Sequence, residues 1–276
     1  MRQLKIVVEL VKDKMQIKIR HWLVSLFILS GLILGGCSSE QAASQSSASS
    51  TDTAQVSSSA TQTTSVTANQ AGSPQMNDLP VLEGEAIVVM TVKGSPITIK
   101  VDGKDAQITA GNFVDLVQRG VYDGLMFHRV VRQPQPFVVQ GGDPQSKDPK
   151  FPQQRLGTGG FTDPKTGNQR YIPLEIEPEG ADAPIYGKTL ESAGAATAPK
   201  LKHTRGAVAM ARSQQPNSAS SQFYIALADL PFLDGSYAVF GYVTQGMEVV
   251  DKIQQGDRIE SAKVTQGAEN LKDGGK

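Results

Sequence analysis

Two strand-like stretches carry the side chains with the clearest chemical potential: "FHRVVRQPQPFVVQGGD" at 127–143 and "SQFYIALA" at 221–228. They place Arg129, Gln140 and Gln222 among apolar β-formers. Because alternate residues of a strand point to the same face of a sheet, one face can gather a guanidinium and two amides. A few hydrogen-bonding groups beside apolar side chains are typical of a ligand site.

The same alternation predicts on which face of the sheet the neighbouring apolar side chains lie. Val138 shares the face of Gln140, and Tyr224 shares the face of Gln222. Phe223 points the opposite way, toward the expected core. The loop "LPFLDGSY" adds further apolar side chains, those of Phe232, Leu233 and Tyr237.

Each of these residues also has a purely structural interpretation. A strand arginine such as Arg129 is commonly a solvated edge residue, and Gln140 or Gln222 taken alone is commonly a surface amide. His128 suits a hydrogen-bonded structural role. Three aromatic residues would ordinarily belong to the core: Phe137, Tyr224 and Phe232. The functional interpretation therefore depends on the combined pattern.

Common catalytic chemistries lack their signatures. The 3 histidines have no HExxH spacing, and the 1 cysteine offers no cysteine–histidine metal set. No G-x-S-x-G elbow occurs, so a hydrolase would need a nucleophile that the sequence does not reveal. The 27 basic and 27 acidic residues leave no net charge to attract nucleic acid. We expect no metal, no cofactor and no nucleic-acid partner.

The N-terminal region has the features of an export signal. Residues 22–34 are apolar, follow a basic segment ending in Lys18 and Arg20, and lead into "LGGC" ending at Cys37. This run is short for a membrane-spanning helix but suits the apolar part of a signal peptide. It resembles a bacterial lipoprotein signal, whose cysteine is lipidated. The alternatives are an uncleaved anchor helix or an ordinary signal, and Met15 is an alternative start.

The chain of 276 residues thus divides into three parts. We expect a signal peptide at 1–36, a lipidated cysteine with a disordered tether at 37–80, and a folded domain at 81–276. The tether is rich in Ser, Thr, Ala and Gln and has too few apolar residues to form a core. The predicted location is the bacterial cell envelope, on the exported side of a membrane.

Short apolar runs separated by turn residues dominate the third part. A helix is expected at 109–120, with Thr109 as its cap and Gly120 at its end, and a shorter one at 247–256. A hairpin turn is expected at Lys93–Pro96. Further strands are expected at 125–131, 137–142, 206–211, 221–228, 237–243 and 260–267. Many strands and few helices predict an antiparallel barrel or sandwich.

The stretches "FHRVV…FVVQGGDP" and "AMARSQQPNSASSQFYIALADLPFLDGSYAVFGYV" resemble the two signature regions of the cyclophilin-type peptidyl-prolyl cis–trans isomerases. The resemblance extends from about Ala86 to Val264. It implies a mainly β fold, a closed eight-stranded antiparallel barrel capped by two α-helices. It also implies that the chain acts as a monomer on proline-containing polypeptides.

The resemblance assigns roles residue by residue. It makes Arg129 the catalytic residue and Gln140 the amide that orients it. It lines the proline pocket with Phe137, Val138, Tyr224, Phe232 and Leu233. It assigns the substrate backbone to Ala211, Arg212 and Ser213, with Gln222 beside them.

Some positions depart from the family pattern. Phe232 and Tyr237 stand where many animal members have tryptophan and histidine, and Arg212 replaces an asparagine. Val138 replaces a methionine of many members, which shortens one pocket wall. Residues 176–203 form a longer segment than usual, expected to be a loop insertion. A module that binds proline segments with little turnover is the alternative function.

Overall fold

The structure, a computed structural model, describes residues 76–272. The predicted signal peptide, Cys37 and nearly all of the tether lie outside these residues. Leu79, just ahead of the first strand, is already buried in the core. Within the described range, no helix combines the length and apolar character required to cross a membrane.

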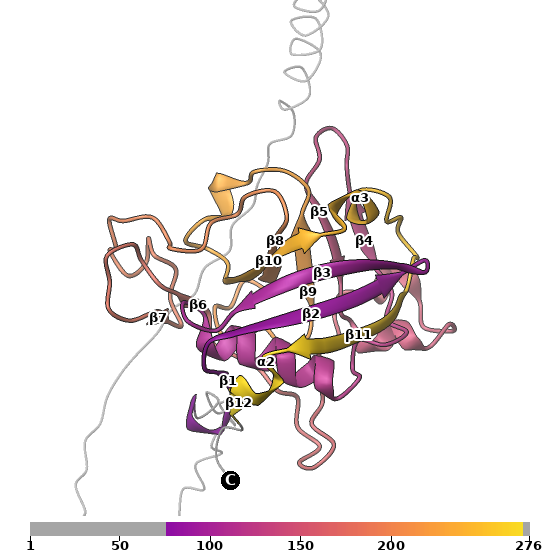
Figure 1. The fold of residues 1–276 in the computed structure, drawn as a ribbon, viewed down its shortest axis with the longest axis horizontal. Coiled ribbons are helices and arrows are strands. Elements are labelled where there is room, and N and C mark those ends of the chain that lie inside the picture. Colours follow the sequence, from indigo (N-terminus) through magenta and orange to yellow (C-terminus); the bar gives the residue numbers. More distant parts are fainter. Residues whose placement is uncertain (1–75, 273–276) are drawn as a thin grey trace, which may run out of the picture. The chain divides into compact units, whose positions relative to one another are not determined.

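One curled antiparallel sheet of eight strands dominates the fold (Figure 1). Its strand order is β11-β2-β3-β10-β8-β9-β5-β4. The strands are β2 (Glu85–Val92), β3 (Ser95–Asp102), β4 (Arg129–Val131), β5 (Val138–Gly141), β8 (Ala207–Met210), β9 (Phe223–Ala226), β10 (Val239–Gln245) and β11 (Ile259–Gln266). Two short pairs lie apart from it, β1 (Val81–Leu82) with β12 (Leu271–Lys272) and β6 (Glu175–Ile176) with β7 (Ile185–Tyr186).

The prediction of a closed barrel is wrong, because β4 and β11 end the sheet without pairing with each other as strands. Among the described residues, the two ends meet near an isolated bridge between Met126 and Arg258. A reason lies in the sequence after β4, where Pro134 and Pro136 lack the N–H groups that a longer ladder would need. The strand stops after three residues.

The predicted hairpin is confirmed between β2 and β3. Lys93 and Gly94 form its two-residue loop, with φ angles of 51° and 70°. Positive φ at both positions is the pattern of a type I′ turn, whose twist matches that of the flanking strands.

Two α-helices accompany the sheet, α2 (Gln107–Gln118) and α3 (Met247–Val250). The first was predicted with Thr109 as its cap, and this detail is wrong. Ala106 occupies the cap position without a side-chain cap bond, while the Thr109 hydroxyl donates to Glu175 Oε2 at 2.7 Å. Gly120 follows the helix with φ of 64°, as its predicted role as terminator requires. The second helix is shorter than predicted.

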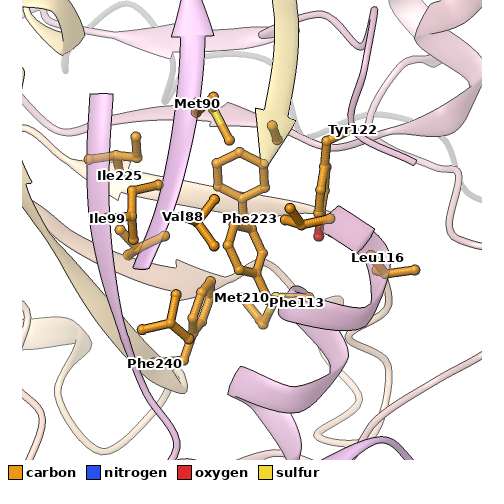
Figure 2. Close-up of a cluster of buried hydrophobic side chains, with 14 of the residues drawn as sticks. Val88, Met90, Ile99, Phe113, Leu116, Tyr122, Met210, Phe223, Ile225 and Phe240 are labelled. Atoms are coloured by element: carbon orange, nitrogen blue, oxygen red, sulfur yellow. The ribbon is translucent and has the colours of Figure 1, made fainter. Parts of the chain in front are cut away.

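The main core lies between α2 and the concave face of the sheet (Figure 2). Phe113 of α2 packs its ring 5.5 Å from that of Phe223 and 4.8 Å from that of Phe240. The predicted core orientation of Phe223 is therefore confirmed. The core fixes the inner face of the strands whose outer face carries Arg129, Gln140 and Tyr224.

Candidate functional site

Four residues on neighbouring strands form a row across the outer face of the sheet. Arg129 of β4 lies opposite Gln140 of β5. Gln140 lies opposite Tyr224 of β9, which lies opposite Ala209 of β8. Cross-strand partners point to the same face, so the sheet brings together the side chains that strand alternation grouped. The row is set by strand register.

Two glutamine amides connect the row to a neighbouring loop. Arg129 Nη1 donates to Gln140 Oε1 at 3.2 Å. Gln140 Nε2 donates to Gln222 Oε1 at 3.2 Å, and Gln222 Nε2 donates to the carbonyl oxygen of Gly159 at 2.7 Å. Arg129 is exposed. Since a guanidinium has five N–H donors and Gln140 takes one, donors remain for a ligand.

An apolar surface borders the guanidinium. The guanidinium carbon of Arg129 lies 5.5 Å from the ring centre of Phe137, which stacks on Phe232 at 6.0 Å. The interpretation of Phe232 as a core residue is wrong, because it is 69% exposed. The surface is built on an outer-face cluster of Val138, Ala207, Ala209, Tyr224, Ala226, Leu230 and Val239, against which Phe137, Leu233 and Tyr237 pack.

The Tyr224 hydroxyl contacts His203, which in turn contacts Asp234. Sequence reasoning assigned neither His203 nor Asp234 to the site. His203 Nε2 lies 2.9 Å from the Tyr224 hydroxyl, and His203 Nδ1 lies 2.8 Å from Asp234 Oδ1. His203 is buried, and burial lowers its pKa although the Asp234 carboxylate opposes this. Tyr224 and Asp234 both lie in the second signature stretch, but His203 lies outside it, and no spacing in the sequence connects the three side chains. The contacts fix the Tyr224 ring.

The depressed pKa of His203 predicts a loss of stability in acid. The unfolded chain binds the proton near the ordinary value of about 6.5 and the folded chain does so only at lower pH, so the free energy of unfolding should fall below about pH 6.5. The slope from one such group is at most about 1.4 kcal/mol per pH unit. His128, whose pKa is also lowered by burial, adds in the same direction, and Glu175, whose pKa burial raises, acts oppositely.

Urea unfolding of the wild type and of His203→Gln between pH 5 and pH 8 measures this contribution. The variant should show a shallower decline on the acid side, because one titrating group is removed while His128 and Glu175 remain. Equal slopes for the two proteins would contradict the prediction.

The three residues assigned to the substrate backbone differ in what they can offer. The N–H of Ala211 already donates to the Gln222 carbonyl, and that of Ser213 donates to the Ser218 hydroxyl. The N–H of Arg212 has no partner among the described residues and remains free for a ligand. The Arg212 side chain is engaged elsewhere, since its guanidinium donates to the carbonyl of Ser236 at 2.7 Å.

His128 stands beside the row. Its two ring nitrogens are buried, and among residues 76–272 neither has a hydrogen bond of ordinary geometry, so the expected hydrogen-bonded structural role is not seen. Burial lowers its pKa, and the nearby Asp143 carboxylate and Gln222 amide oppose only part of this effect. A neutral imidazole therefore lies behind Gln222.

A cavity of about 360 Å³ adjoins the two amides. It is lined by Gln140, Gly157, Thr158, Gly159, Gln169, Tyr171, Ala211, Arg212, Ser213, Ser218, Ser220 and Gln222. A larger depression of about 620 Å³ lies between β4 and the segment after α3, away from Gln140 and Gln222. We place the site along the row that ends at the smaller cavity, because Gln140 and Gln222 line this cavity and the apolar surface of Phe137 borders Arg129 at the other end of the row. Within 76–272, no cluster of metal-ligating side chains is found.

A comparison with protein families decides the relationship of the chain. The family described as "Cyclophilin type peptidyl-prolyl cis-trans isomerase/CLD" matches residues 87–270. The chain belongs to this family. The match includes every described residue of the row and of the apolar surface, so the cyclophilin family membership applies to the domain that carries the site.

The names of individual relatives agree with this family assignment. A Synechocystis sp. protein, named as a thylakoid lumen peptidyl-prolyl cis–trans isomerase, is 46% identical over 208 residues, covering 71% of this chain and 51% of that protein. A chloroplastic peptidyl-prolyl cis–trans isomerase of Arabidopsis thaliana is 40% identical, covering 71% and 46%. A peptidyl-prolyl cis–trans isomerase of Helicobacter pylori is 37% identical, covering 63% and 83%. The chain thus spans about half the length of the first two relatives.

Proposed function

We propose that this cyclophilin domain accelerates rotation about X–Pro peptide bonds in flexible polypeptides, with Arg129 donating a hydrogen bond to the prolyl nitrogen. One observation carries the proposal: Gln140 holds an exposed guanidinium at the border of an exposed apolar surface that includes Phe232. The site contains a fixed donor and a place for a proline ring. It requires no general acid, general base or nucleophile.

Peptide-bond resonance explains how such a donor lowers the barrier. Rotation about an X–Pro bond crosses a barrier of about 20 kcal/mol, because twisting breaks the resonance. The twisted bond leaves a lone pair on the prolyl nitrogen, which can accept a hydrogen bond that the planar bond cannot. A donor placed at that nitrogen binds the transition state better than either isomer, and this difference is what lowers the barrier. Arginine stays protonated at all relevant pH values.

The apolar surface provides the contact for the proline ring. The stacked rings of Phe137 and Phe232, with Val138 and Leu233, offer a wall of the size and polarity that a proline ring requires. The free N–H of Arg212 can hold the substrate backbone on the other side of Gln140. With both ends held, rotation is confined to the bond beside Arg129.

A protease-coupled assay on a proline-containing tetrapeptide tests the proposal with the full chain. We expect the cis-to-trans rate to rise in proportion to protein concentration. A module that only binds proline segments is the second candidate, favoured by the 69% exposure of Phe232. Binding of the peptide without acceleration would establish that candidate and refute the isomerase proposal.

We further propose that the domain works outside the cytoplasm, attached to a membrane by a lipid on Cys37. The signal-like segment at 22–34 and the sequence leading to Cys37 support this. The names of the Synechocystis and Arabidopsis relatives place those proteins in the thylakoid lumen and the chloroplast, which is consistent with an extracytoplasmic role.

Replacing Cys37 with serine should move the protein from the membrane fraction to the soluble fraction of a bacterial host, because the lipid is the expected anchor. Ser39→Ala is the matched control and should stay with the membrane. Fractionation and immunoblotting measure both. If Cys37→Ser remains with the membrane, the segment at 22–34 is an anchor helix instead.

A further inference from the structure

A buried carboxylate lies at the far end of the hydrogen-bond chain that reaches Arg129. Asp143 lies two residues after the end of β5 and is fully buried. Its Oδ2 accepts the N–H of Gly157 at 2.6 Å and that of Gly159 at 3.2 Å, and its Oδ1 accepts the N–H of Gln145 at 2.9 Å. One side chain therefore fixes both ends of the loop 157–159.

The loop fits this carboxylate closely. Gly157 has φ of 94°, a conformation that disfavours residues with a side chain. A Cβ on Gly159 would lie 2.2 Å from Asp143 Oδ1, so only glycine allows the carboxylate to reach the loop backbone. A segment this rich in glycine has high conformational entropy when free. The bonds to Asp143 hold the N–H groups of its two glycines, while the Thr158 hydroxyl donates to the carbonyl of Arg155 at 2.8 Å.

The loop determines the direction of the two amides. The Gly159 carbonyl can only accept, so Gln222 must turn its NH₂ group toward it and its oxygen toward Gln140. Gln140 must then present its NH₂ group to Gln222 and its oxygen to Arg129. A guanidinium can only donate, so the chain is satisfied in this direction alone. Without the carbonyl, Gln222 loses the acceptor that holds it, and the direction of the two amides is set only by the exposed guanidinium at the other end.

We infer that Asp143 is a positioning residue for Arg129, acting through the loop 157–159 and the amides of Gln222 and Gln140. Asp143 does not contact the substrate; it fixes the acceptor that sets the direction of the chain. The inference rests on the proposed function, in which Arg129 donates to the prolyl nitrogen.

Replacing Asp143 with asparagine tests the inference with a side chain of the same size. The variant should retain a cooperative fold and lose about tenfold in kcat/KM, chiefly in kcat, because a small misplacement of the donor weakens the transition state. Asp148→Asn is the matched control. Asp148 also accepts a backbone N–H, that of Lys150 at 2.8 Å, in an exposed turn without a link to Gln222. It should keep the wild-type rate.

A double-mutant cycle separates positioning from general support of the fold. In a Gln222→Ala background the chain is already interrupted, so Asp143→Asn should lower the rate by less than about twofold, while its effect on urea unfolding persists. The same tenfold loss in both backgrounds would overturn the inference, as would an unchanged rate for Asp143→Asn.

A second variant is available if Asp143→Asn does not fold. Gly159→Ala should displace the loop by the clash with Asp143 and show the same dependence on Gln222. Gly167→Ala is the control for adding a methyl group to a loop glycine, because no atom lies within 4 Å of the added group, although its φ of 71° adds backbone strain that Gly159 lacks. A fully active Arg129→Ala would refute the proposed function itself. An inactive Arg129→Ala with no coupling of Asp143 to Gln222 would refute this inference alone.

Discussion

Replacing Arg129 with alanine should lower kcat/KM on a proline tetrapeptide by about 10²–10³, the usual effect of one preorganised donor. That loss corresponds to about 3 to 4 kcal/mol of transition-state stabilisation. It should appear mainly in kcat, because the bond to the prolyl nitrogen forms only in the twisted state. The kcat/KM of Arg129→Lys should lie between that of the wild type and that of Arg129→Ala. Lysine keeps a positive charge but lacks the planar guanidinium that donates to Gln140.

The matched control for this experiment is Arg155→Ala. The Arg155 guanidinium lies 5.5 Å from the ring centre of Phe151, the same distance that separates Arg129 from Phe137. It therefore repeats the contact of an arginine with an aromatic ring but lies outside the row. We expect Arg155→Ala to keep the wild-type rate in the protease-coupled assay. Full activity of Arg129→Ala would contradict the mechanism.

One hydrogen bond does not account for a useful rate enhancement. If folding requires roughly 10⁵, the total is near 7 kcal/mol, about twice what a single donor supplies. The remainder falls to the apolar wall and to exclusion of water around the rotating bond. In the proposed mechanism, the proline ring covers the exposed side chain of Phe232.

Strand alternation made the outer-face row predictable from the sequence. With a period of two, Val138 and Gln140 had to leave the core if Val139 entered it, and the structure buries Val139 in the main core. The same logic oriented Tyr224 against Phe223. Local patterns therefore determine which side chains share a face, because the face depends only on neighbours within the strand.

Contacts between distant segments were not predictable in this way. The partners Asp143 and Gly159 are joined through a loop, and His203 meets Asp234 across 31 positions. Such contacts leave no periodic signal in one sequence. Failure to close the barrel has the same origin, since the extent of β4 is set by where the chain leaves the sheet. The antiparallel sheet was predicted correctly, whereas the prediction that it closes into a barrel was wrong.

The second large expected effect is on the stability of the fold, and it comes from replacing Glu175. Its buried carboxylate accepts the N–H groups of Ile108 and Thr109 at 3.2 and 2.7 Å and the Thr109 hydroxyl at 2.7 Å. It also accepts the Tyr186 hydroxyl at 3.1 Å, from the segment expected to be a loop insertion. It thus caps α2 from a distance in sequence, in place of a local cap residue. A carboxylate near a helix N-terminus is also favoured by the helix dipole.

Glu175→Ala should lower the free energy of unfolding by about 3 to 5 kcal/mol, because three buried donors at the start of α2 lose their acceptor and each costs roughly 1 to 3 kcal/mol without full additivity. Urea unfolding measures the change. Glu179→Ala is the control: its ion pair with Lys202, at 2.8 Å, is about half exposed, so its loss should cost less than about 0.5 kcal/mol. Similar effects for the two variants would contradict the capping role. A large difference would mean that Glu175 holds the start of α2 from outside the helix.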